Sequence, residues 1–163
     1  MSIYTKTGDT GETLDLSGQR VSKNDVMIHF VGAVDELNSH LGLIKAMLSD
    51  NNTRQFIEEI QKKIIKMMSH ASDTANAQYR FCEEEVSFLE KEIDKLSEQL
   101  PQQIQFVLPG RNVTEAQIHI ARTVARRAER LFFAVHEKQP LCPNAGVYLN
   151  RLSDYLFVLA MTS

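Results

Sequence analysis

The residues that most clearly suggest chemistry are four arginines within nine positions of one another. Arginine carries a planar cation that forms paired hydrogen bonds with phosphate oxygens. A single acid, Glu129, lies among them. A solvated helix face with charge pairs one turn apart is the simpler interpretation of any charge run. The excess of positive charge favours a bound polyanion instead, and the arginines concerned are Arg122, Arg126, Arg127 and Arg130.

A second candidate anion site lies near the N-terminus, where glycines punctuate a run of threonine, serine and aspartate. Glycine lets the backbone approach an anion and present N–H groups to it. Threonine hydroxyls, Lys6 and Lys23 offer further groups for the same anion. The pattern TGDTG at residues 7–11 differs from the phosphate-binding pattern G-x-x-x-x-G-K-[ST], so a flexible N-terminal arm is the alternative interpretation.

The arginines need a helix to position them, and we expect one from Val113 to Lys138. A Pro-Gly pair interrupts the chain before it, at positions 109 and 110, and Asn112 or Thr114 can cap its start. Apolar residues at three- and four-residue steps predict its core side, namely Ile120, Val124, Ala128, Leu131 and Val135. The side predicted to face away from the core carries His119, Arg122, Arg126, Glu129 and Phe133.

The rest of the chain shows the same helical period. It predicts four more helices, at about Asp25 to Ser49, Thr53 to Ala77, Glu84 to Gln99 and Ala145 to Met161. No sustained two-residue alternation, internal repeat or linker interrupts them. A length of 163 residues with 43% hydrophobic content suits one core. We therefore expect residues 1–163 to form a single all-α domain, a five-helix up-and-down bundle with an N-terminal nucleotide-binding loop.

Several function classes are disfavoured by composition. The net charge of −3 argues against general binding of nucleic acid or membranes. Without a signal peptide or a long apolar run, a cytoplasmic protein is expected. Cys82 and Cys142 suit reduced thiols better than a disulfide framework or a metal site. No Glu-x-x-His motif and no catalytic triad pattern are present, so we expect no protein-bound metal and no protein nucleophile.

Five segments in order resemble one known family. They are YTKTGDTGET, SKND followed by VGAVDELNSHLGL, FVLPG, HIARTVARRAER and YLNRLSDYLFVLA. Together they are similar to the PduO-type ATP:cob(I)alamin adenosyltransferases, also called corrinoid adenosyltransferases. The resemblance runs from about residue 3 to residue 160 and so covers nearly the whole chain.

The resemblance implies a homotrimer of five-helix bundles, with each active site between neighbouring subunits. It also implies transfer of the 5′-deoxyadenosyl group of ATP to the cobalt of cob(I)alamin, giving adenosylcobalamin and triphosphate. The corrinoid is then its own nucleophile, which agrees with the lack of one in the chain. Bound Mg²⁺ would need few protein ligands beyond the phosphates. The implied protein partners are a flavoprotein reductase and an adenosylcobalamin-dependent acceptor enzyme.

The resemblance also assigns residues. Arg126 is the first choice for a directly catalytic residue, and Arg122 and Asp35 match an inter-subunit ion pair. Phe106 matches the aromatic residue that keeps axial ligands off the lower face of the corrin. The implied nucleotide-binding residues are Thr5, Lys6, Thr7, Gly8, Thr13, Leu14, Lys23, Arg126, Arg127, Ala128, Glu129, Arg130 and Asn150.

Two positions depart from the family pattern. Leu14 stands where the family usually has serine, and Arg111 stands where it has a second glycine. Two other kinds of protein remain as alternatives. One is a catalytically silent homologue that binds ATP or adenosylcobalamin for sensing or delivery, which should lose Phe106 or Arg126. The other is a purely structural helical trimer, which gives no reason for the threonine- and glycine-rich N-terminus.

Overall fold

The computed structural model describes residue 4, residues 6–101 and residues 107–163. Their dominant structure is α-helical, which confirms the prediction of a mostly helical protein with five helices. The described residues form five α-helices, α1 (Val26–Met47), α2 (Asn51–Ser72), α3 (Glu83–Ser97), α4 (Val113–His136) and α5 (Pro143–Thr162). A short 3₁₀ helix, η1 (Ala77–Tyr79), lies between α2 and α3. Two short strands, β1 (Glu12–Leu14) and β2 (Arg20–Ser22), form an antiparallel hairpin near the N-terminus.

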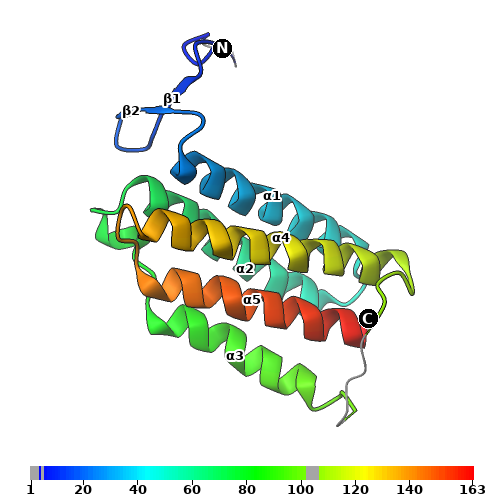
Figure 1. Cartoon of the computed structure of the whole chain (residues 1–163). Coiled ribbons are helices and arrows are strands. Elements are labelled where there is room, and N and C mark those ends of the chain that lie inside the picture. The colour runs from blue at the N-terminus through cyan, green and yellow to red at the C-terminus, as the bar shows by residue number, and fades with distance from the viewer. Residues whose placement is uncertain (1–3, 5, 102–106) are drawn as a thin grey trace.

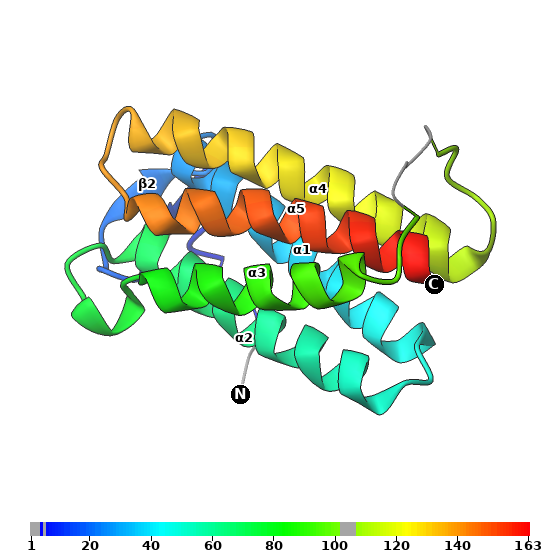
Figure 2. The same cartoon turned by 90° about the horizontal axis from the view of Figure 1, so that it is seen from below.

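The helices lie side by side and run alternately in opposite directions (Figures 1 and 2). Helix α1 packs against α2 and α4, α4 also packs against α5, and α5 packs against α3. The hairpin projects from the start of α1, beyond the layer of helices (Figure 1). None of the helices in the described part of the chain is both long and apolar enough to span a membrane.

Local sequence explains where the helices begin. The carboxylates of Asp25 and Asp50 accept hydrogen bonds of 2.8 Å from the backbone N–H groups of Met27 and Thr53, at the first turns of α1 and α2. The Asn112 side chain accepts one of 2.8 Å from the Glu115 N–H at the start of α4. These contacts satisfy backbone donors that have no partner within their own helix.

The second helix is shorter than the sequence predicts, because α2 ends at Ser72 rather than near Ala77. Asp73 leaves the helical conformation, with φ −147° and ψ 82°. Asn76 then starts η1 by accepting a hydrogen bond of 3.1 Å from the backbone of Gln78. Asparagine favours such local side-chain contacts over helix continuation, and the periodicity of apolar residues does not register that preference.

The core side of α4 also differs from the prediction. Ile120 is 47% exposed, whereas His119 is only 5% exposed. Because α4 packs against both α1 and α5, its buried stripe is wider than one row of residues. The predicted Val124, Ala128 and Val135 are buried, and Phe133 faces away from the core as expected. The stripe also takes in Glu115, Ile118, Ala121, Ala125 and Phe132.

Candidate functional site

The N-terminal hairpin encloses a small cavity of about 250 Å³. Gly8 forms one wall, and a Cβ atom there would lie 3.1 Å from Nζ of Lys23, so glycine lets the lysine side chain lie against the backbone. The Lys23 backbone N–H donates a hydrogen bond of 2.8 Å to the Gly11 carbonyl and so ties the end of the hairpin to its first turn. The cavity is lined by Thr7, Gly8, Thr13, Leu14, Arg20 and Lys23.

Five of these six lining residues are among the predicted nucleotide-binding residues, and the structure brings them together. Lys6 is exposed and takes a positive φ of 60°, whereas Thr5 lies outside the described residues. The sixth residue, Arg20, was not predicted. It pairs across the hairpin with Leu14, and its guanidinium lies 3.1 Å from the Glu12 carboxylate. Recognising it requires the strand register, which three-residue strands do not reveal in a sequence.

Leu14 lies in this cavity with 59% of its surface exposed. An exposed leucine beside threonine hydroxyls and a lysine gives the pocket one apolar wall. Compared with the serine that the family resemblance implies at this position, Leu14 brings no hydroxyl to the cavity. The hairpin backbone beside it is held by the pairing of Thr13 with Val21.

The arginines of α4 differ in their ion-pair and hydrogen-bond partners. Arg127 forms an ion pair with Glu36 of α1, and Arg130 donates a hydrogen bond of 3.1 Å to the backbone carbonyl of Arg126. Among the described residues, no carboxylate lies within 4.0 Å of the Arg126 guanidinium, which is exposed. Arg126 therefore offers an unneutralised charge to an anion, as its predicted catalytic role requires.

Glu129 and Asn150, both predicted, meet between α4 and α5. The Asn150 amide donates a hydrogen bond of 3.0 Å to the Glu129 carboxylate and accepts one of 2.9 Å from Arg151. Arg151 also contacts Glu90 of α3 at 2.9 Å. Ala128 is fully buried, so its side chain packs in the core and only its position on the helix places it near the arginines.

Asp35 and Arg122 do not form an ion pair with each other within the described chain. Asp35 is exposed on α1, and its backbone carbonyl accepts a hydrogen bond of 3.1 Å from Ser39. Arg122 is half-buried and donates a hydrogen bond of 3.2 Å to Nδ1 of His119. Their predicted pairing concerns two different subunits, and one chain holds only one half of each pair. Phe106 lies outside the described residues.

Glu115 is a polar residue of this region that was not predicted. It is fully buried at the start of α4 and accepts hydrogen bonds from the backbone N–H groups of Gly110 (2.7 Å) and Arg111 (3.1 Å). The Gly110 hydrogen bond is the main cause that lowers the pKa of Glu115, and burial opposes it. A readable signal existed, since Asn112 followed three residues later by Glu is a helix-start pattern.

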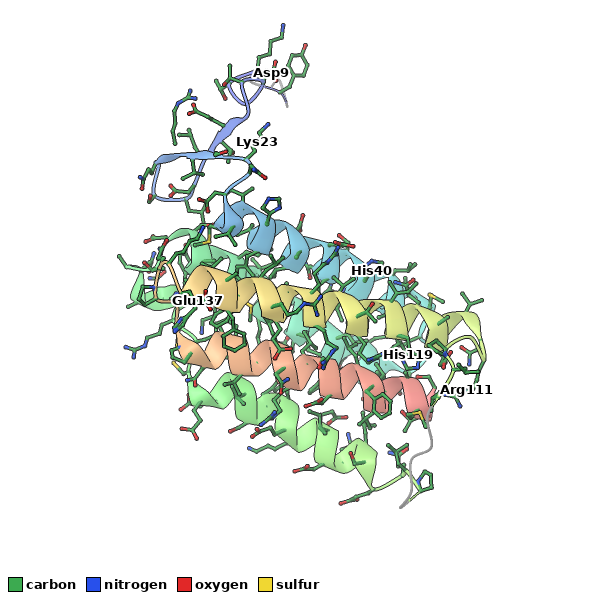
Figure 3. The ribbon with its side chains drawn as sticks, in the orientation of Figure 1. Asp9, Lys23, His40, Arg111, His119 and Glu137 are labelled. Carbon is green, nitrogen blue, oxygen red and sulfur yellow. The ribbon has the colours of Figure 1, made fainter. Side chains whose placement is uncertain are left out.

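The hairpin and the arginine face are separate in one chain. The hairpin projects from the start of α1, and Lys23 is drawn well above the helices (Figures 1 and 3). Within the described ranges, no hydrogen bond or ion pair joins residues 8–23 to α4. The structure thus gathers the predicted site residues into two groups rather than one.

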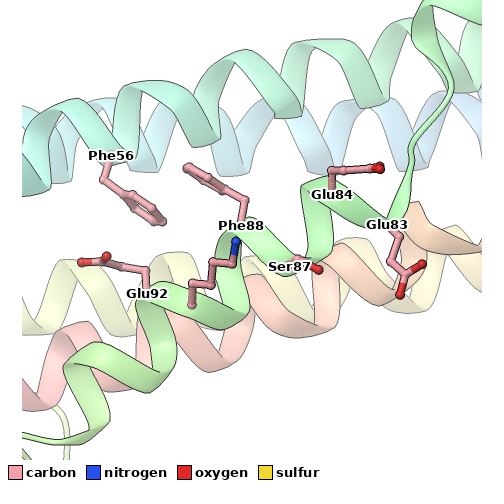
Figure 4. Close-up of a pocket in the computed structure, with 7 residues that line it drawn as sticks. Phe56, Glu83, Glu84, Ser87, Phe88 and Glu92 are labelled. Atoms are coloured by element: carbon pink, nitrogen blue, oxygen red, sulfur yellow. The ribbon is translucent and has the colours of Figure 1, made fainter.

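Another hollow, of about 570 Å³, lies between α2 and α3, away from both groups (Figure 4). Phe56 and Phe88 line it, and their rings stack on each other with centroids 4.4 Å apart. Beside it, Cys82, Glu84 and Glu85 place possible metal-ligand atoms within 4.8 Å of one another. Glu85 already contacts Lys66 and the Cys82 N–H, so the arrangement is explained by capping of α3.

Comparisons with known proteins agree over nearly the whole chain. The family model described as cobalamin adenosyltransferase matches residues 3–163. A corrinoid adenosyltransferase of Citrobacter freundii is 38% identical over 162 residues, which cover 97% of this chain and 92% of that protein. A corrinoid adenosyltransferase of Bacillus subtilis (strain 168) is 38% identical over 168 residues, which cover 98% of this chain and 85% of that protein. Among solved structures, a variant PduO-type ATP:corrinoid adenosyltransferase from Lactobacillus reuteri complexed with cobalamin and ATP superposes with a TM-score of 0.90 at 32% identity, covering 98% of this chain and 91% of that one.

Proposed function

Because this chain belongs to the cobalamin adenosyltransferase family, we propose that it transfers the 5′-deoxyadenosyl group of ATP to the cobalt of cob(I)alamin. The products are adenosylcobalamin and triphosphate. The observation that carries the proposal is the hairpin cavity, where Gly8, Lys23 and Thr13 present a backbone approach, a cation and a hydroxyl to one small space. A purely structural helical protein has no use for that combination.

The reaction needs little covalent chemistry from the protein. The cobalt supplies an electron pair and forms a bond to C5′ of ATP, while the C5′–oxygen bond breaks and its electron pair leaves with triphosphate. The protein must align the two substrates and neutralise the charge on the leaving group. Lys23 and Arg126 are the residues we assign to that task, since both offer cations near the predicted nucleotide groups.

We further propose that each active site is shared by two subunits of a homotrimer. One subunit would contribute the hairpin with Lys23, and its neighbour the arginine face of α4. The separation of these two groups within one chain supports this arrangement, because a single subunit leaves both half-sites exposed. Head-to-tail contacts of this kind form a closed ring when the rotation between neighbouring subunits is a third of a turn.

Mg²⁺ is proposed to accompany ATP. The hairpin cavity is lined by Thr7 and Thr13, whose oxygens suit a hard cation, and phosphate oxygens and water would supply its other ligands. Residues 1–163 would act as one domain in the cytoplasm. A flavoprotein reductase would supply the corrinoid in reduced form, and an adenosylcobalamin-dependent enzyme would receive the product.

One experiment separates this function from its alternatives. The protein is mixed with ATP, Mg²⁺ and chemically reduced cobalamin, and the corrin spectrum is followed for the adenosylated product. Turnover supports the transferase. Binding of ATP or adenosylcobalamin without turnover would identify a sensing or delivery protein, and an absence of both binding and turnover would leave a structural trimer.

A further inference from the structure

A fully buried carboxylate, Glu115, fastens the loop of residues 107–112 to the first turn of α4. Its Oε2 atom accepts hydrogen bonds of 2.7 Å from the Gly110 N–H and 3.1 Å from the Arg111 N–H. These two amides precede the helix, whose own first turn is already capped by Asn112. The contacts of Glu115 therefore go beyond starting the helix and fix the backbone of the loop.

Arg111 fastens the same loop to a second helix. Its Nη2 atom donates a hydrogen bond of 2.6 Å to the carbonyl of Ala160, near the end of α5. Its Nε atom lies 3.6 Å from Oε1 of Glu115. A cation suits this position because the last carbonyls of a helix lack partners and carry partial negative charge. Arg111 and Glu115 thus connect the loop to both α4 and α5. Arg111 is labelled in Figure 3.

His119 continues the network toward Arg122. Because Arg122 Nε donates to His119 Nδ1, the proton of the neutral ring is assigned to Nε2. Nε2 lies 3.2 Å from Oε1 of Glu115, close enough for an ion-pair contact, although neither atom makes a hydrogen bond among the described residues. One chain of contacts therefore runs from the loop through Glu115 and His119 to Arg122.

We propose that Glu115 is a positioning residue that holds the loop of residues 107–112 in the conformation needed for corrinoid binding, and links that loop to Arg122 through His119. The inference rests on the proposed function and deepens it. The loop directly follows Phe106, the residue that the family resemblance assigns to the corrin. Burying a carboxylate is costly unless its charge is compensated. Here two backbone N–H groups donate to Oε2, and Arg111 and His119 lie 3.6 and 3.2 Å from Oε1.

The test compares Glu115→Ala with Glu115→Gln, which keeps an oxygen able to accept from the two loop amides. Glu85→Ala is the matched control. Glu85 occupies the same position in the first turn of α3, accepts from the Cys82 N–H at 2.7 Å and pairs with Lys66. Helix α3 begins at the opposite end of the bundle from α4, so the control loses a helix cap without touching the loop (Figure 1).

We expect Glu115→Ala to raise the KM for the corrinoid by about tenfold or more while the KM for ATP stays within about twofold. Glu115→Gln should lie between Glu115→Ala and the wild type. Amide hydrogen exchange of Gly110 and Arg111 should accelerate in Glu115→Ala. Glu85→Ala should lower the melting temperature and leave both KM values and the exchange of these two amides unchanged.

Failure of the inference and failure of the proposed function give different results. No adenosylated product from the wild type would overturn the proposed function. Product from the wild type, with the same corrinoid KM in Glu115→Ala, would overturn the inference. Parallel rises in the KM for ATP and for the corrinoid, or the same corrinoid effect in Glu85→Ala, would also overturn it, because either result would reduce Glu115 to a helix cap.

Discussion

Arg122 of α4 donates a hydrogen bond of 3.2 Å from Nε to Nδ1 of His119, one turn earlier on the same helix. The contact uses one edge of the guanidinium and holds the side chain in place. In the part of the chain that the structure describes, the two terminal nitrogens of Arg122 have no hydrogen-bond partner. They could bind a carboxylate from another subunit, which is the role that the family resemblance gives to Asp35.

The first prediction concerns this pair. Asp35→Ala and Arg122→Ala should each impair trimer assembly or corrinoid binding. Removing one partner leaves the charge of the other unpaired at the interface. The double variant should therefore lose far less corrinoid affinity than the sum of the two single losses. A double-mutant cycle on the dissociation constant for the corrinoid should give a coupling of about 0.5–3 kcal/mol. Additive losses would show that the two residues do not touch.

Gly146 gives a prediction about stability. A Cβ atom there would lie 2.5 Å from Cε1 of Phe132, so α5 can approach α4 this closely only with glycine. Gly146→Ala should lower the free energy of unfolding by about 1–3 kcal/mol. Gly42→Ala is the control, because its Cβ would meet Gln61 at an ordinary 3.4 Å. That variant should gain about 0.5–1 kcal/mol in chemical denaturation, and equal effects of the two changes would contradict the packing explanation.

The third prediction concerns acid sensitivity. Burial lowers the pKa of His119 and of His70 below the usual value, with further lowering by Arg122 and Lys66 respectively. The folded state therefore resists protonation of both rings more than the unfolded state does. Their contribution to stability is present above about pH 6.5 and is lost as the pH falls toward the folded-state pKa values.

The measurement is the free energy of unfolding as a function of pH, for the wild type and for the His70→Gln/His119→Gln double variant. Glutamine keeps an oxygen that can accept the hydrogen bonds now made by Cys142 N–H and Arg122. The wild type should lose stability on acidification below about pH 6.5, and the double variant should lose less. If the free energy of unfolding falls equally with pH in both proteins, these histidines are not the cause of the acid sensitivity.

The sequence predicts the helices well because each presents a long apolar period between clear breaks. The ends of α1, α3, α4 and α5 lie within about two residues of the expected ones, within the ordinary scatter of helix boundaries. The end of α2 differs because Asp73 and Asn76 act through local side-chain contacts. The wider buried face of α4 was not predictable from one helix alone, since it depends on which two neighbours the helix packs against.

Some residues of the candidate site could likewise be predicted from the sequence, and others could not. The lining of the hairpin cavity by Thr7, Gly8, Thr13, Leu14 and Lys23 follows from their short separation in sequence. Arg20 depends on strand register and was missed. The buried network of Glu115 was missed although its capping pattern was readable, because a charged residue near a helix start is usually exposed. In the proposed trimer the hairpin meets α4 of a second subunit, and the helical periodicity within one chain does not predict such a contact.

Phe106 lies outside the described residues, and its prediction rests on the family resemblance. Phe106→Ala should lose most activity when the assay starts from cob(II)alamin and a mild reductant, because water or a base can then occupy the lower axial position of cobalt. It should lose much less with chemically prepared cob(I)alamin, which already disfavours axial ligands. Spectroscopy of the cob(II)alamin complex with ATP should show less four-coordinate species. Equal losses in both assays would assign Phe106 to packing or binding alone.

The most direct test of a shared active site mixes two inactive variants. Lys23→Ala disables the hairpin and Arg126→Ala disables the arginine face, and each variant alone should form a folded trimer without turnover. Equal amounts are unfolded, mixed and refolded together, and formation of adenosylcobalamin from ATP and cob(I)alamin is measured. If each site joins the hairpin of one subunit to α4 of the next, both intact residues meet at about a quarter of the sites, so about a quarter of the wild-type activity should return. A mixture of trimers that remains as inactive as its separate components would contradict a site built from two subunits.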